Sequence, residues 1–436
     1  MLSSLRRARI EYPRQFWLLF WGMLISTTGA SMVWPFLMLY VSKRVDLPLT
    51  AVAGLMTLNS GFGLVFSFIA GPITDRFGRK WVMFTGLLFN GLAYLMMSSA
   101  GTYAAFAVMM SISGAFNPLY RVGANAMLAD LVPSEKRADA FSLLRLSNNV
   151  GVAAGPALGG LAAVTSYSLA FFGAAAGLIT FSILVLLFAV ETLPAAARQD
   201  KTSLKIGKSS PTFGSRRFSR LLPSLKRAIF SAYIPVFRDR HFLHVIGSLT
   251  LTIICAGMMW VLLPVYTNTH FNIPESQYGL IPTTNALMVV FLQIGITNFS
   301  KRRPPLYMMA LGSLFFALGV GSVSLGQGFW GFWLSMVIMT FGELILIPTN
   351  DTYIANLAPL EMRGRYMSLA GLTWGIATGI GPVIGGFLSD QIAPVTIWYG
   401  ALVIGLCGAL GFLVLARSRR RASRMSEVRE TEARIQ

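Results

Sequence analysis

Long apolar stretches make up most of the chain, and short polar segments separate them. Each stretch is close to the roughly 20 residues that a helix needs to cross a bilayer. The pattern predicts an all-α integral membrane protein with twelve transmembrane helices, at residues 15–40, 50–73, 81–99, 104–130, 138–164, 168–191, 241–266, 276–299, 305–325, 329–356, 363–389 and 395–416.

Composition supports the membrane assignment. Of the 436 residues, 54% are hydrophobic and 12% are charged, which is about half the charged share of a soluble domain. This excludes soluble and disordered classes. The first apolar stretch is too long for a cleaved signal peptide, so we expect it to be the first span. The two cysteines and three histidines are scattered, so we predict no disulfide, no metal site and no cofactor.

Positive charge predicts the orientation. With alternating spans, 32 of the 36 Lys and Arg residues fall on one side of the membrane, only Lys43 and Arg44 fall on the other, and Arg121 and Arg145 fall inside spans. The positive-inside rule therefore places both termini in the cytoplasm and the protein in the plasma membrane. We expect the surplus charge to attract anionic lipid head groups, and we expect no binding of nucleic acid.

The chain contains an internal repeat. A shift of 226 residues aligns residues 129–160 with 355–386 at twelve identical positions of 32. Parallel repeats of this kind build transporters with a central site between the halves. In the linker, the sequence RRFSRLLPSLKRAIFSAYI permits either a helix on the inner leaflet or a solvated tether. We predict a cytoplasmic segment, a six-helix bundle, a basic linker, a second six-helix bundle and a basic tail, at 1–14, 15–191, 192–240, 241–416 and 417–436.

The segment GPITDRFGRK between the second and third spans resembles the signature loop of the major facilitator superfamily. Glycines permit a tight turn, Asp75 is suited to a helix N-terminus, and Arg76 and Arg79 are suited to bridging to a carboxylate, for which Asp130 is our candidate. The resemblance implies the fold of that superfamily and a latch that holds the cytoplasmic side closed. The matching residues and the candidate partner are Gly71, Asp75, Arg76, Gly78, Arg79, Lys80 and Asp130.

The fifth span contains GVAAGPALGG, which resembles an element of the drug:proton antiporter branch of the same superfamily. Its small residues, spaced four apart, permit close helix packing, and packing alone is the alternative explanation. The second half repeats part of the element. The branch usually has an arginine in the outer half of the fourth span, where this chain has Met109 and Met110. The element comprises Gly151, Gly155, Pro156, Gly159 and Gly160.

Ionisable residues within spans indicate function because burial in the bilayer is costly. Glu343 lies near the middle of the tenth span and is our candidate proton carrier; the alternative is a neutral acid hydrogen-bonded between helices. Asp351, nearer the cytoplasm, is a second candidate or part of a gate. In the fourth span Asn117, Arg121 and Asn125 share one face, and the 226-residue shift places Asn117 on Glu343 and Asn125 on Asp351. We expect Arg145 to pair with Asp130 or Glu135.

Further polar and aromatic residues are candidates for contact with substrate, because the resemblance implies a central cavity lined by the first, fourth, seventh and tenth spans. Aromatic rings stack on planar or cationic molecules, although packing and interfacial positions compete with that role. These candidates are Asn59, Asn285, Gln293, Asn350, Trp34, Tyr40 and Trp374.

Together these patterns predict a secondary transporter that works by alternating access. The resemblance favours proton-coupled export of small amphiphilic or cationic compounds by a monomer. The alternative is an importer or facilitator of a sugar, organic anion or lipid-like metabolite, for which Arg121 would bind the anion. The sequence lacks a phosphate-binding loop and a nucleophile–base pair, so we expect no enzyme activity. A sensor or scaffold with this fold would need a docking partner on the linker.

Overall fold

The structure, a computed structural model, describes residues 12–193, 234–359 and 362–435. Its first half forms a bundle of helices that we call the N-bundle. Pro35 lies in a single 3-10 turn that interrupts the first span, as expected where a helix loses a backbone donor. The elements of the N-bundle are α2 (Arg14–Val33), η1 (Trp34–Phe36), α3 (Leu37–Arg44), α4 (Leu49–Phe77), α5 (Arg79–Met97), α6 (Tyr103–Leu131), η2 (Ser134–Lys136), α7 (Arg137–Thr165) and α8 (Tyr167–Phe188).

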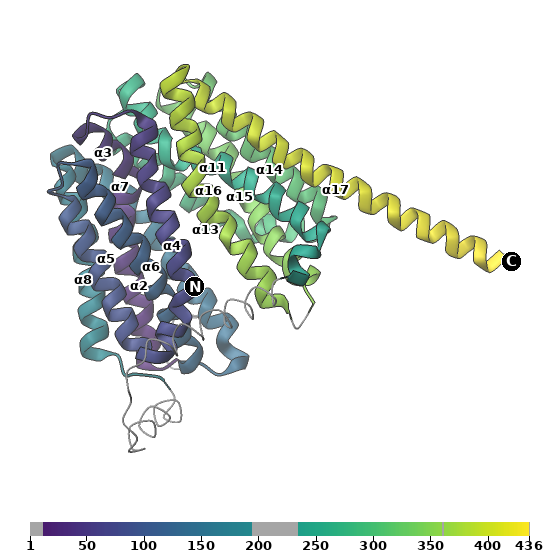
Figure 1. The fold of residues 1–436 in the computed structure, drawn as a ribbon, viewed down its shortest axis with the longest axis horizontal. Coiled ribbons are helices and arrows are strands. Elements are labelled where there is room, and N and C mark those ends of the chain that lie inside the picture. The colour runs from purple at the N-terminus through teal and green to yellow at the C-terminus, as the bar shows by residue number, and fades with distance from the viewer. Residues whose placement is uncertain (1–11, 194–233, 360–361, 436) are drawn as a thin grey trace, which may run out of the picture.

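The second half forms the C-bundle, which lies beside the N-bundle (Figure 1). Its last helix continues beyond the predicted span end at residue 416 and extends from the bundle in Figure 1. The predicted surface helix of the linker falls outside the described residues. The elements are α11 (Arg240–Phe271), α12 (Glu275–Tyr278), α13 (Leu280–Ser300), α14 (Pro305–Gly321), η3 (Ser322–Leu325), α15 (Phe329–Leu357), α16 (Arg363–Gln391) and α17 (Thr396–Ile435).

The helix bounds repeat at the same 226-residue interval as the sequence. Both ends of α6 fall on those of α15, and both ends of α7 fall on those of α16. Among the described residues, nine helical segments are long and apolar enough to cross a membrane. The segments α5, α6 and α7 have 19, 29 and 29 residues, which is sufficient length. These three helices are not among the nine, so for them the prediction of a membrane span rests on their length.

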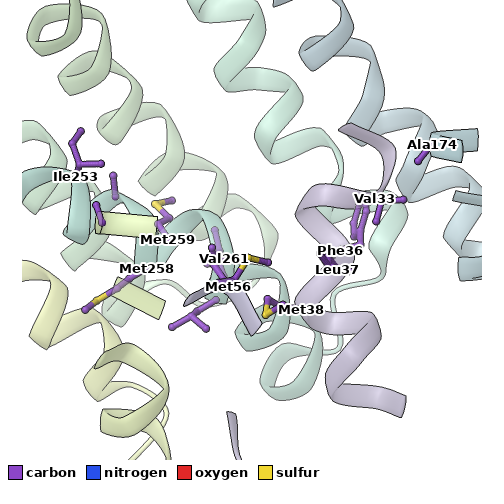
Figure 2. Packing of buried hydrophobic residues seen from close by; sticks show 14 of the residues in the cluster. Val33, Phe36, Leu37, Met38, Met56, Ala174, Ile253, Met258, Met259 and Val261 are labelled. Atoms are coloured by element: carbon purple, nitrogen blue, oxygen red, sulfur yellow. The ribbon is translucent and has the colours of Figure 1, made fainter. Parts of the chain in front are cut away.

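The successive helices run in alternating directions, so the bundles have two end faces. We call the face formed near residues 77–79, 131–137 and 357–363 the terminal face, and the face formed near residues 44–49 and 271–280 the distal face. The two bundles share one large apolar cluster, to which η1, α3 and α4 of the N-bundle and α11 of the C-bundle contribute among other helices. Figure 2 shows these residues, among them Met38, Met56 and Val261.

Glycines of α7 set how closely the helices approach. A Cβ at Gly155 would lie 2.8 Å from the carbonyl oxygen of Thr28, and a Cβ at Gly159 would lie 2.7 Å from the Cα of Met32. Gly151 faces Thr27 in the same way, so these three glycines pack α7 against α2. Gly160 instead faces the backbone of Glu275 in the C-bundle. The element therefore serves both packing within a bundle and contact between bundles.

Candidate functional site

The polar stripe of α6 lines a cavity. Asn117, Arg121 and Asn125 are all exposed although the flanking residues of α6 are buried. Arg121 and Asn125, together with Arg145 and Asn148 of α7, line a space of about 600 Å³. Arg121 lies ten residues before the end of α6 and Arg145 eight residues after the start of α7, about 15 and 12 Å along the helix from the terminal face. Both guanidinium groups therefore lie at membrane depth.

A second cavity, of about 370 Å³, lies deeper and is lined by both bundles. Asn117, one helical turn from Arg121, connects it to the first cavity along α6. Trp34 and Asn59 contribute from the N-bundle, and Trp260 from α11. The Nδ2 atom of Asn59 donates to the carbonyl oxygen of Met110 at 2.9 Å. The deep cavity thus combines aromatic walls with a few amide groups, which is typical of small-molecule sites.

Glu343 lies half-buried between α15 and α13. The Nδ2 atom of Asn285 donates to Glu343 Oε2 at 2.8 Å and to Thr340 Oγ1 at 2.9 Å. The 226-residue shift pairs Asn285 with Asn59 and Glu343 with Asn117. Each bundle therefore has an asparagine at the first position, and only the C-bundle has a carboxylate at the second. Glu343 lies about 21 Å along the helix from the terminal face, since α15 ends at Leu357.

Asp351 is exposed, two turns nearer the terminal face. Its Oδ1 atom lies 3.5 Å from Nδ2 of Asn350, which is itself buried with an unpaired side-chain oxygen. Arg145 lies close enough for its charge to act on both Glu343 and Asp351 from the opposite bundle. Of the two partners that we expected for Arg145, Asp130 is wrong, because Arg79 takes that place and Arg145 lines the cavity. The side chain of Glu135, the other expected partner, lies outside the described part of the chain.

Three further candidates lie elsewhere. Tyr40 is buried against Phe106 and Phe171, and its hydroxyl donates to the carbonyl oxygen of Ser98 at 2.9 Å, so its predicted contact with substrate in the central cavity is wrong. Gln293 donates to Thr297 Oγ1 within α13 and to the carbonyl oxygen of Leu344. Trp374 is largely exposed on α16. Neither Gln293 nor Trp374 lines the two cavities above.

The signature segment is almost entirely helical. Only Gly78, with φ 97°, lies outside α4 and α5, so the predicted connection at residues 74–80 is wrong in length: it is a single residue. Gly71 has open space around its Cα and serves no close approach. Arg79 Nε lies 3.0 Å from Asp130 Oδ2, and its Nη1 lies 3.3 Å from Asp75 Oδ1. The Arg76 guanidinium lies 5.6 Å from the ring of Phe77, and Lys80 belongs to the first turn of α5.

Sequence reasoning missed Glu191, which follows α8. Its carboxylate accepts from the backbone N–H groups of Arg79 and Lys80, at 2.9 and 3.1 Å, and so caps α5. The adjacent Thr192 donates to Asp130 at 2.9 Å. The expected place of Asp75 at a helix N-terminus is therefore taken by Glu191, and the Asp75 side chain is 73% exposed.

Polar contacts join the bundles near the distal face. Lys43 Nζ lies 2.9 Å from Glu275 Oε1, and the Tyr167 hydroxyl also bonds to this carboxylate. At a second point Asp390 of α16 accepts from the backbone N–H groups of Leu49 and Thr50, at 3.2 and 2.8 Å. We call these two groups of contacts the distal lock. The bundles are thus joined at the distal face, while the arginine cavity opens toward the terminal face.

Comparison with known proteins places this geometry in a family. Residues 19–270 and 245–435 match the sequence profile of the Major Facilitator Superfamily. The chain belongs to this superfamily.

Its relatives have varied printed functions. A Na(+), Li(+), K(+)/H(+) antiporter of Planococcus maritimus is 25% identical over 405 residues, covering 87% of this chain and 88% of the relative. The quinolone resistance protein NorA of Staphylococcus aureus is 24% identical over 414 residues, covering 94% and 98%. The solved structure of the peptide transporter POT with sulfate has a TM-score of 0.71 at 20% identity, covering 93% and 95%. That of the nucleoside transporter NupG has a TM-score of 0.74 at 12% identity, covering 92% and 99%.

Membership confirms the predicted fold class and the absence of an enzyme function. This Major Facilitator Superfamily protein is a multi-pass membrane protein and a secondary transporter of small molecules. Two arginines of the N-bundle line a cavity, and two carboxylates, Glu343 and Asp351, lie on α15 of the C-bundle. Such a cavity is suited to binding a polar solute and exchanging a proton in one place.

Proposed function

We propose that the chain is a proton-coupled antiporter of the plasma membrane that exports small amphiphilic or cationic compounds. In this proposal it acts as a monomer. Both termini lie in the cytoplasm, because almost all basic residues belong to the terminal face. In that orientation the distal lock closes the outside, and the arginine cavity faces the cytoplasm. The resemblance of the Gly155–Pro156 element to drug:proton antiporters supports export, as does the similarity to NorA.

Glu343 carries the proposal. It is an acid at membrane depth that is half-buried, holds one amide partner and faces a cation from the other bundle. When Arg145 or a cationic solute approaches, the ionised form is favoured and the proton leaves. When the bundles separate, the buried acid takes a proton again. This alternation couples the proton to the exported compound, because binding of either one lowers the affinity of the site for the other.

The experiment is transport by purified protein in liposomes, with ethidium as an amphiphilic cation and indole-3-propionate as an amphiphilic anion. In an antiporter, protons that flow down their gradient drive the solute in the opposite direction, so the solute accumulates on the side that the protons leave. We expect Glu343→Gln to abolish accumulation driven by a pH gradient while exchange without a gradient persists. Asp46→Asn, which removes an exposed carboxylate from the distal face, is the matched control. Unchanged pH dependence in Glu343→Gln would exclude Glu343 from coupling.

A second candidate is an importer or facilitator of a sugar, organic anion or lipid-like metabolite. The exposed pair Arg121 and Arg145 favours the anion among these, because guanidinium groups bind carboxylates and phosphates in pairs of hydrogen bonds. The same liposome experiment separates the two functions. A proton-coupled importer accumulates its solute when the proton and solute gradients run in the same direction, and a facilitator never exceeds equilibrium.

A further inference from the structure

The two bundles repeat in structure, yet matched positions of α6 and α15, and of α7 and α16, differ in charge. The 226-residue shift places Arg121 on Ile347 and Arg145 on Gly371. It likewise places Asn117 on Glu343 and Asn125 on Asp351. Every one of these four pairs puts the more positive member in the N-bundle. A repeated scaffold has no packing reason for such a bias, since both copies hold their helices with the same bounds.

No described acid lies in ion-pair contact with the arginine pair, although the charge of Arg145 acts at longer range on Glu343 and Asp351. Among the described residues, neither Arg121 nor Arg145 takes part in a hydrogen bond or ion pair, and both line the same 600 Å³ cavity. Lys136 and Arg137, which flank the end of α6 and the start of α7, lie at the terminal face, whereas Arg121 and Arg145 lie about 15 and 12 Å along their helices from that face. Ionisable residues within spans are rare and mark substrate or ion pathways when they face a cavity, so a general preference for positive charge in the cytoplasm does not explain these two arginines.

The surroundings define the chemistry that fits. Asn125 and Asn148 border the arginines and offer further amide donors. One turn deeper, Asn117 leads to the cavity bordered by the indoles of Trp34 and Trp260. A carboxylate or phosphate would bind between the guanidinium groups, and an attached apolar body would lie toward the indoles.

From this arrangement we infer that Arg121 and Arg145 form a subsite for an anionic group, and that the transported compound carries a carboxylate or phosphate on an apolar body. The inference rests on the proposed transport site and narrows its substrate class: among the amphiphilic or cationic compounds proposed above, it selects those that carry an anionic group and disfavours purely cationic ones. An amine on the same molecule would face Glu343 and Asp351, so a zwitterion fits both walls. A purely cationic compound would meet the arginines unfavourably.

Binding to the purified full chain tests the subsite without any gradient. The probes are tryptophan, tryptamine and indole-3-propionate, which share an indole body and differ in head group. Thermal unfolding and titration calorimetry report their binding. We expect the two carboxylates to bind and tryptamine to bind more weakly. Arg121→Gln and Arg145→Gln should each weaken binding of the carboxylates about tenfold, and Arg121→Lys should recover part of the loss, because lysine keeps the charge without the planar fork.

Arg302→Gln is the matched control, since it removes an exposed arginine from the terminal face outside the cavity. Unfolding temperatures without probe show whether each variant is folded. Tighter binding of tryptamine than of the carboxylates, no saturable binding of a carboxylate, or equal binding of carboxylates in the arginine variants would overturn the inference. Loss of proton coupling in the liposome experiment with carboxylate binding intact would reject the proposed antiport and leave the subsite standing.

Discussion

Removal of the Asp390 carboxylate should weaken the closure of the distal face. Asp390 accepts three hydrogen bonds from the start of α4, at 3.2 Å from Leu49 N, 2.8 Å from Thr50 N and 2.6 Å from Thr50 Oγ1. The N-cap residue of α4 itself is Pro48, whose side chain has no hydrogen-bond acceptor. The carboxylate of the opposite bundle therefore caps this helix, whose first N–H groups have no partner within the helix.

The size of the effect follows from capping energies. Replacing an aspartate cap by alanine costs about 0.5–2 kcal/mol, and Asp390 is partly exposed to solvent, which favours the lower part of that range. Because this cap joins two bundles, its loss acts on the equilibrium between closed and open distal faces. We expect Asp390→Ala to shift that equilibrium about 2- to 5-fold toward the open form.

Spin labels on the two bundles measure this shift. Ser99→Cys and Gln327→Cys place labels in exposed distal loops of the N-bundle and C-bundle, in a background where the exposed Cys407 is replaced by serine. Asp390→Ala should add a population of longer distances in double electron–electron resonance. Asp46→Ala removes an exposed carboxylate of the same face and is the control. An unchanged distance distribution in Asp390→Ala, or an equal change in Asp46→Ala, would refute the capping argument.

Three further changes test other parts of the structure. Asp75→Asn should reduce transport strongly without lowering the unfolding temperature, because its side chain is exposed here; full activity in the liposome assay would contradict a latch. Gly159→Ala should destabilise the protein by about 1–3 kcal/mol, because the added Cβ meets the backbone of Met32, whereas Gly61→Ala, with open space around it, should not lower the unfolding temperature. Glu191→Gln should lower the unfolding temperature by weakening the cap of α5; an unchanged temperature would show that the cap adds no stability.

Elements were predictable from the sequence where the signal is local. Apolar runs of membrane length predicted most helix ends to within a few residues of those in the structure. The same 226-residue shift that relates the two sequence segments also relates the ends of α6 to those of α15. The 3.6-residue period also placed Asn117, Arg121 and Asn125 on one face, and all three are exposed. Such inferences need only the geometry of one helix.

Contacts between distant segments were not predictable. Asp390 and Thr50 are 340 residues apart, and their contact depends on how two bundles pack, which no spacing in one helix specifies. Tyr40 shows the same limit, because an aromatic residue in a span fits a cavity or a packed interior equally well. Glu191 offered one signal, an acid directly after an apolar run, but its partners on α5 depend on the tertiary arrangement.

The helix α4 connects the two gates of the molecule. Its first turn is capped by Asp390 at the end of α16, and Asp75 lies in its last turn, on the terminal side where α16 begins at Arg363. Side-chain hydrogen bonds also join the two helices farther along α4, from Thr57 to the carbonyl oxygen of Gly379 at 2.6 Å and between Ser60 and Thr378 at 3.1 Å. The superfamily latch implied by the sequence uses Asp75 when the terminal face is closed, whereas the structure has the opposite end joined and Asp75 exposed. Alternating access requires the two states to lie within a few kcal/mol of each other, because a deep preference for either state would stop the cycle. The Asp390 contacts that join α4 to α16 must therefore be weak enough to break during transport.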